Sequence, residues 1–183
     1  MLTTTLNHIR VNHPGHASFA ALLQDLGKTQ ADDESLPYDE ILRLRGFEFA
    51  VWACCAEPRY DAVWSAYAIR CARRAQHLMK DPRSVAVLDV AERHLRGEAT
   101  DAELSDAIVA ASQVHASTAM DLGRIDAATH AAGAATFAAL PKSGGNIATV
   151  VRGAFLAHDT QDREAVRKAQ VEDFLCVVSM EAA

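Results

Sequence analysis

The chain has 183 residues, a formal net charge of -6 and 50% hydrophobic residues, of which only a small part is aromatic. A chain of this length can bury a core large enough for one domain over residues 1–183 without disulfides or metals. Its acidity argues against direct binding to nucleic acid, and its longest apolar runs are too short to span a membrane. Because alanine, a strong helix former, dominates the apolar share, we expect an all-α bundle of about eight or nine helices with an Ala-rich C-terminal half.

Punctuation by glycine and proline defines the first elements. Residues 1–16 are expected to form an extended or flexible tail, and a helix over 17–26 follows, which Gly27 ends. The pattern then predicts a helix over 37–45, closed by Gly46, because proline is tolerated in the first turn and glycine favours the end. These signals indicate two short helices before the first strongly apolar segment.

The middle of the chain contains longer predicted helices. Residues 47–56 are almost wholly apolar and predict a buried helix, and Pro58 begins a long helix that runs to Lys80. Asp81 is an expected cap for a helix over 82–97. Thr100–Glu103 reads as a capping box, in which a threonine hydroxyl and a glutamate carboxylate each satisfy a backbone N–H group.

Alanine dominates the C-terminal part. Residues 102–140 predict a helical hairpin interrupted near Gly123, and the segment 141–146, PKSGGN, is the clearest break in the chain. An apolar helix over 147–156 and an amphipathic helix over 163–178 complete the prediction. No internal repeat of fixed period is present.

Two sets of residues are expected to pack together. Large side chains on the apolar stripes of the middle helices predict one core cluster, in which truncation of Trp52 would cost about 3 to 5 kcal/mol. Its members are Phe49, Trp52, Trp64, Tyr67, Leu78, Leu88 and Leu95. A small-residue face can pack within the chain or against a second copy, and we predict a homodimer. That face consists of Ala107, Ala110, Ala111, Ala128, Ala131, Ala132 and Ala135.

No sequence motif indicates catalysis. The four cysteines form no C-x-x-C pair and the N-terminus lacks a secretory signal, so we expect reduced thiols in the cytoplasm of a bacterial host cell. Leu26–Thr29 imitates the end of a P-loop, but position 22 is a leucine where that motif needs glycine. The run Ser143–Asn146 is a flexible loop or an anion-holding one. His13 and His16 are the only close histidine pair and lack further ligands. We predict no catalytic residue, no cofactor and no metal.

A basic segment stands out from the acidic chain. Residues 68–84, AIRCARRAQHLMKDPRS, contain four arginines, one lysine and one histidine. On one helix, positions three and four apart share a face, so four of these residues form a basic stripe. The stripe either pairs with carboxylates such as Asp89 and Glu92 or binds an acidic partner. We expect Arg70 and Arg74 to be paired within the chain, and Arg73 and His77 to face a partner. The candidate partner-binding residues are Arg70, Arg73, Arg74 and His77.

Two long segments carry a family resemblance. They are LGKTQADDESLPYDEILRLRGFEFAVWAC, at Leu26–Cys54, and IRCARRAQHLMKDPRSVAVLDVAERHLRGEATDAEL, at Ile69–Leu104. Over roughly residues 17–112 the chain resembles a phage and prophage family of small Ala-rich helical proteins that are assigned as immunity proteins of polymorphic toxin systems. The resemblance implies an all-helical fold and supplies no catalytic residue. It also implies that the acidic loop Ala31–Glu34 caps a helix or pairs with the basic stripe.

Two classes of function follow. The first is a non-enzymatic protein of phage or prophage origin that occludes a host or toxin protein, as an immunity protein or counter-defence inhibitor does. The second is a small helical enzyme or anionic-ligand-binding protein with a pocket near the basic stripe. A deep pocket containing the stripe would favour the second class, and arginines already paired within the chain would favour the first.

Overall fold

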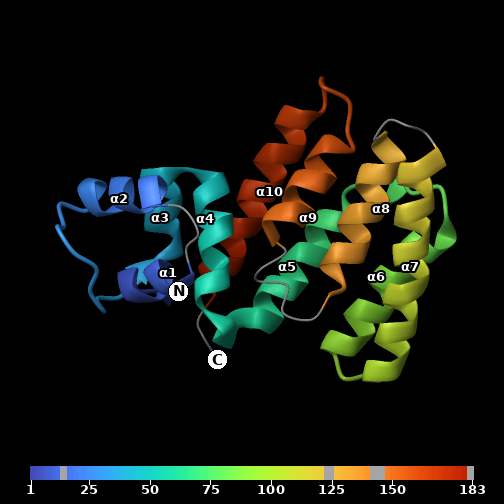
Figure 1. Cartoon of the computed structure of the whole chain (residues 1–183), viewed down its shortest axis with the longest axis horizontal. Helices are drawn as coiled ribbons and strands as arrows, with labels where there is room; N and C mark the ends of the chain where they lie inside the picture. The colour runs from blue at the N-terminus through green and yellow to red at the C-terminus, as the bar shows by residue number, and fades with distance from the viewer. Residues whose placement is uncertain (13–15, 122–125, 141–146, 181–183) are drawn as a thin grey trace.

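The computed structural model describes residues 1–12, 16–121, 126–140 and 147–180, and this part of the chain is all-α, as predicted (Figure 1). It contains ten α-helices, three short 3-10 helices and one pair of two-residue strands. In chain order the elements are β1 (Thr3–Thr4), α1 (Leu6–Asn12), α2 (His16–Asp25), β2 (Leu36–Pro37), α3 (Tyr38–Arg45), α4 (Phe47–Ala53), η1 (Cys54–Ala56), η2 (Pro58–Tyr60), α5 (Asp61–Arg73), η3 (Gln76–Leu78), α6 (Pro82–Leu95), α7 (Asp101–Asp121), α8 (Ala127–Ala138), α9 (Ile147–Leu156) and α10 (Arg163–Val178).

The N-terminal segment corrects the expectation of an extended or flexible tail over 1–16. Thr3 and Thr4 pair antiparallel with Pro37 and Leu36, and residues 6–12 form α1. Leu2, Leu6 and Ile9 are buried, and the Leu2 amide donates to the Val178 carbonyl at 2.7 Å. The start of the chain is therefore part of the core, because three apolar side chains gain more by burial than the segment loses by ordering.

Local capping signals match the structure closely. Gly27, Gly46 and Gly97 have positive φ values, and the Asp81 carboxylate accepts from the Arg83 amide at the start of α6. At α7 the Thr100 amide donates to Glu103 Oε2 at 2.8 Å, and the Glu103 amide donates to Thr100 Oγ1 at 3.2 Å. The capping box is thus confirmed, and it satisfies two N–H groups that a helix start leaves without partners.

The predicted long helix from Pro58 to Lys80 is wrong as one element. It consists of η2, α5 and η3, with α5 ending at Arg73. The apolar helix over 47–56 is likewise shorter, since α4 gives way to η1 at Cys54, and Glu48 is exposed. The chain changes direction at these breaks between α4, α5 and α6. An apolar stripe predicted for one long helix is therefore split between shorter helices that point in different directions.

The aromatic core centres on α5. Trp64 is fully buried, stacks on Phe174 with ring centroids 6.3 Å apart and meets Tyr38 edge-on at 5.1 Å. Of the predicted cluster, Trp64, Tyr67 and Leu88 are buried, and Phe49, Trp52 and Leu78 pack partly buried against the core. Leu95 does not belong, because it is 39% exposed near the end of α6. The main aromatic anchor of the core is therefore Trp64 rather than Trp52.

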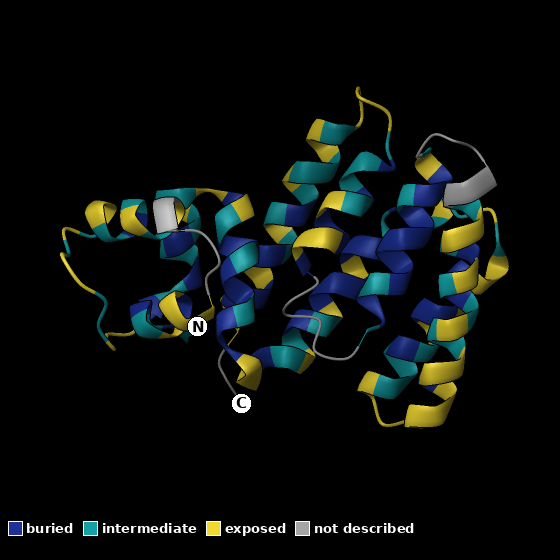
Figure 2. Ribbon diagram, in the orientation of Figure 1, coloured by how far each residue is buried: buried dark blue, intermediate teal, exposed yellow. Residues whose placement is uncertain are grey.

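The alanine face packs inside the chain. Helix α8 lies between α7 and α9 in Figure 1, and most of its length is buried in Figure 2. Five of the seven predicted alanines are buried, while Ala107 and Ala110 are half-buried. The alanine face is used for packing between helices of the same chain. A homodimer stays a prediction and would have to form through another surface. The predicted interruption near Gly123, the break at 141–146 and His13 lie outside the described residues.

Candidate functional site

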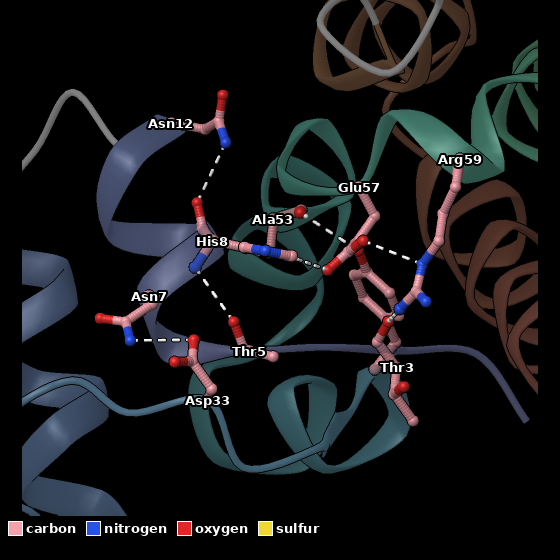
Figure 3. Close-up of polar contacts among 10 residues, drawn as sticks. Thr3, Thr5, Asn7, His8, Asn12, Asp33, Ala53, Glu57 and Arg59 are labelled. Atoms are coloured by element: carbon pink, nitrogen blue, oxygen red, sulfur yellow. Dashed lines mark hydrogen bonds and ion pairs between the residues drawn. The ribbon is translucent and has the colours of Figure 1, made fainter.

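A buried carboxylate organises the polar contacts near the N-terminus (Figure 3). Glu57 is 3% exposed, and its Oε1 lies 2.6 Å from His8 Nδ1 while its Oε2 lies 3.0 Å from Arg59 Nε. Arg59 also donates to the Thr3 carbonyl at 3.1 Å. Tyr38 donates to the Ala53 carbonyl at 3.4 Å. These contacts fasten β1 and α1 to the turn after α4, which is a structural role for this cluster.

The three arginines of the basic stripe are each paired within the chain. Arg73 is bound most firmly, with Nε 2.9 Å from Glu92 Oε1 and Nη2 2.6 Å from Asp89 Oδ1. Arg74 Nη2 and Arg70 Nη1 share Asp173 of α10, at 2.5 and 3.6 Å. The hydrogen bonds of Arg73, chiefly the one to Glu92 and then the one to Asp89, raise the pKa of its guanidinium group. The distances support the ion-paired interpretation, while partner binding at the stripe stays a prediction.

His77 departs from the predicted stripe. It lies on η3 beyond the end of α5, so it does not continue the helical face of Arg70 and Arg73. Its ring instead faces that of His158, with centroids 5.4 Å apart. His158 Nδ1 lies 2.8 Å from the Ala154 carbonyl at the end of α9. The continuous stripe expected from helical spacing is therefore wrong at this residue.

A hollow of about 350 Å³ lies beside the stripe. Arg70 and Arg73 line it, together with Arg96 and the Glu92 carboxylate. Arg96 is held by Glu98 at 2.8 Å, so each of the three arginines has a carboxylate partner within the chain. This arrangement leaves little uncompensated positive charge for an anionic ligand at the stripe.

The remaining motifs have structural explanations. Lys28, in the P-loop imitation, contacts Asp32 at 2.6 Å and Glu34 at 2.5 Å, and these hydrogen bonds raise its pKa. The acidic loop thus holds its own lysine. Cys54 and Cys71 are buried, and burial raises the pKa of Cys71 to about 12, so its thiolate form is disfavoured. Across the described residues no group of three or more metal-ligating side chains is present.

Helix α9 carries a surface that the sequence analysis did not single out. On its α4 and α10 side lies a groove of about 340 Å³, called here the α9 groove. Its floor is buried and apolar, and Arg167 spans the aromatic rings, 4.9 Å from the Phe47 centroid and 4.5 Å from the Phe155 centroid. Its lining residues are Phe47, Glu48, Val51, Ala148, Val151, Arg152, Phe155, Leu156 and Arg167. The groove therefore combines an apolar floor with cationic side chains.

A second hollow, of about 390 Å³, lies on the opposite side of α9 and is called here the α7–α9 hollow. It shares Arg152 and Leu156 with the α9 groove, so the two lie on either side of one helix. No acidic side chain is present among its described lining residues. These are His115, Thr129, His130, Gly133, Ala134, Phe137, Thr149, Arg152, Gly153 and Leu156.

Burial and nearby positive charge disfavour the protonated form of His130 in the α7–α9 hollow. The pKa of His130 is lowered, first by burial and then by the nearby positive charge of Arg163, with Arg152 and His115 acting in the same direction. Asp126 opposes the shift, but its carboxylate already accepts from the Thr129 amide at 2.8 Å and the Thr129 hydroxyl at 2.9 Å. The hollow thus gathers basic groups, and the Asp126 carboxylate is committed to capping α8.

One sequence signal for this surface existed. Arg152 is the only charged residue in the helix over 147–156, where eight of the other nine residues are apolar or glycine. Such a lone charge on an apolar helix marks the edge of its buried stripe. The histidines of α7 and α8 stand singly in sequence, and only the packing of α7, α8 and α9 brings His115 and His130 beside Arg152.

Comparisons with known proteins add no identity. The described helices include none that combines the length and apolarity needed to cross a membrane. No protein-family model, curated protein or solved structure matches this chain.

Proposed function

We propose that the chain is a non-enzymatic protein-binding protein of phage or prophage origin, which acts by occluding a host or toxin protein. The family resemblance of the segments 26–54 and 69–104 suggests this class of partner and an immunity-like or counter-defence role. The observation that carries the proposal further is the α9 groove. It gives a binding protein a specific surface, which the ion-paired basic stripe does not.

The composition of the α9 groove supports a protein ligand. Aromatic and arginine side chains are enriched at protein interfaces and dominate their binding energy. Here Phe47 and Phe155 lie under the Arg167 guanidinium, and Ala148 is exposed beside them, which leaves room for an incoming side chain. Arg152 is exposed and makes no ion pair with another described residue.

Charge complementarity defines the occupant. The chain as a whole is acidic, yet two arginines line this groove, Arg152 exposed and Arg167 half-buried. Glu48 is the one acid among the described lining residues; it is 78% exposed and lies 3.1 Å from Arg167. A partner segment with an apolar anchor and flanking acidic residues would fill the apolar floor and pair with Arg152. We therefore assign the groove to an acidic segment of the partner protein.

Substitution at Ala148 tests the proposal. Ala148→Glu places a negative charge in the groove and should repel an acidic segment, while Ala116→Glu makes the same change on the exposed face of α7. Each variant and the unchanged protein are used to capture proteins from a bacterial lysate, and the captured protein is then purified and titrated by calorimetry. We expect Ala148→Glu to weaken binding about tenfold or more and Ala116→Glu to leave it unchanged. A partner bound equally by both variants, or no partner at all, would refute the proposal.

A further inference from the structure

We propose that the α7–α9 hollow binds a small organic anion, a carboxylate or phosphate attached to a compact apolar body, through Arg152, His115 and His130. The site lies beyond the proposed function, because it takes a free small molecule rather than a protein segment. Its volume of about 390 Å³ falls in the range of ligand sites in proteins, which is roughly 300 to 1,000 Å³.

The first argument is the unusual state of Arg152. Arginine side chains in this protein are regularly engaged: Arg73, Arg74 and Arg167 hold carboxylates, and Arg163 donates to two carbonyl groups at the end of α9. Within the described chain only Arg10 and Arg152 make neither an ion pair nor a hydrogen bond. Arg152 alone of these two lines a hollow among those given above. A guanidinium with five N–H donors suits a planar carboxylate or a phosphate.

The second argument is the position of the two histidines. His115 Nδ1 is buried and has no hydrogen-bond partner among the described residues. The His115 ring contacts the Phe137 ring, with centroids 6.1 Å apart. It also packs closely on Gly133, where an added Cβ atom would lie 2.8 Å from His115 Cε1. Burial of an unpartnered polar atom is costly, so a ligand that completes the hydrogen bonding of this hollow would be favoured.

The charged groups around His130 are mostly positive, which favours an anionic ligand. Arg152 of α9, Arg163 of α10 and His115 of α7 act on it as positive groups, and the carboxylate of Asp126, at the start of its own helix, opposes them. An anion beside Arg152 would offset this repulsion and allow His130 to become protonated. Binding should therefore strengthen as pH falls toward the range in which His130 takes up its proton.

The lining also defines the rest of the ligand. Phe137, Leu156 and Ala134 supply apolar surface, while Gly133 and Gly153 bring α8 close to its neighbours. A Cβ atom at Gly153 would lie 3.3 Å from the His130 carbonyl, so the glycine permits this close approach. An aromatic acid or an aryl phosphate matches such a site better than a fully hydrated inorganic ion.

Histidine ring signals in NMR spectra test the proposal on the purified full-length protein. The probes are benzoate and phenyl phosphate, with benzyl alcohol and benzylamine as neutral and cationic counterparts. Ring signals are assigned with His115→Gln and His130→Gln. We expect either acid to shift the signals of both histidines at millimolar concentration, more strongly at acidic than at neutral pH, while the two counterparts leave them in place.

Two arginine variants complete the test. Arg152→Gln should weaken binding of the acids about tenfold, whereas Arg10→Gln, at the other unpaired and exposed arginine, should leave it unchanged. Thermal melting of both variants checks that each remains folded. Absence of any shift, equal shifts with all four probes, or equal effects of the two variants would overturn the proposal. Because no partner protein is used, failure here is distinct from failure of the α9 groove.

Discussion

Trp64 holds the aromatic core together at the level of single residues. It is fully buried and contacts the rings of Tyr38, Tyr60 and Phe174, which come from three other segments of the chain. Trp64→Ala should lower the free energy of unfolding by about 3 to 5 kcal/mol, because it leaves a large cavity. Trp52→Ala should cost clearly less, since Trp52 is only partly buried. Urea denaturation of both variants checks this order, and equal losses would contradict it.

Glu57 is the second residue on which local structure depends. Its carboxylate is nearly fully buried, while its partners His8 and Arg59 are 54% and 59% exposed. Glu57→Gln keeps the size but removes the charge that holds both partners. We expect a loss of about 1 to 3 kcal/mol, smaller than for a fully buried pair because solvent screens the exposed partners. Asp61→Asn is the control, because Asp61 is a half-buried acid that makes no ion pair with another described residue, and it should change stability little. Equal melting temperatures for Glu57→Gln and the unchanged protein would contradict this role.

At the level of elements, the packing of α7 on α8 depends on a glycine. Gly133 is buried in α8, where alanine would normally be favoured by about 0.5 to 1 kcal/mol, yet an added Cβ would lie 2.8 Å from His115 Cε1. Gly133→Ala should therefore destabilise the protein by about 1 to 3 kcal/mol. In a His115→Ala background the obstruction is gone, and the same change should be neutral or stabilising. A double-mutant cycle by chemical denaturation measures this coupling, and additive effects would argue against the contact.

Helix boundaries were predictable where a local signal sets them. Gly46, Asp81 and the Thr100–Glu103 box act within one turn of the chain, so the sequence reveals the end of α3 and the starts of α6 and α7. The N-terminal strand and helix were missed because their stability comes from distant partners. The Leu2 amide donates to the Val178 carbonyl, and the neighbouring β1 pairs with β2. These partners are far away in the sequence, so no local pattern reveals the contacts.

The same reason explains what could be predicted of the site. The arginines of the basic stripe were visible as a helical pattern, and Glu92 and Asp89 were correctly named as partners of the stripe. Asp173, which pairs with Arg70 and Arg74, comes from α10 and was out of reach. Of the α9 surface only the lone charge of Arg152 was visible in the sequence, because the rest of the lining comes from helices far apart in the sequence.

At the level of the whole molecule, carboxylates stabilise the fold at neutral pH. Hydrogen bonds from Arg83 lower the pKa of Asp81 to about 2, and the pKa values of Asp32, Glu103 and Asp126 are lowered by Lys28, Thr100 and Thr129. A carboxyl whose pKa is lower in the folded state stabilises that state above its unfolded pKa and loses the effect as pH falls. Stability should thus decrease between about pH 4.5 and pH 2. Urea midpoints at neutral pH and near pH 3 check this, and equal midpoints would contradict it.

The central claim is that the α9 groove is the surface through which this protein binds a partner. The most direct measurement is photocrosslinking in living bacterial cells, with a benzophenone amino acid placed at Ala148 in the groove or at Ala116 on the exposed face of α7. The account predicts a discrete crosslinked species of higher mass from position 148 and none from position 116. Crosslinking only from position 116, or none from either position, would contradict the account.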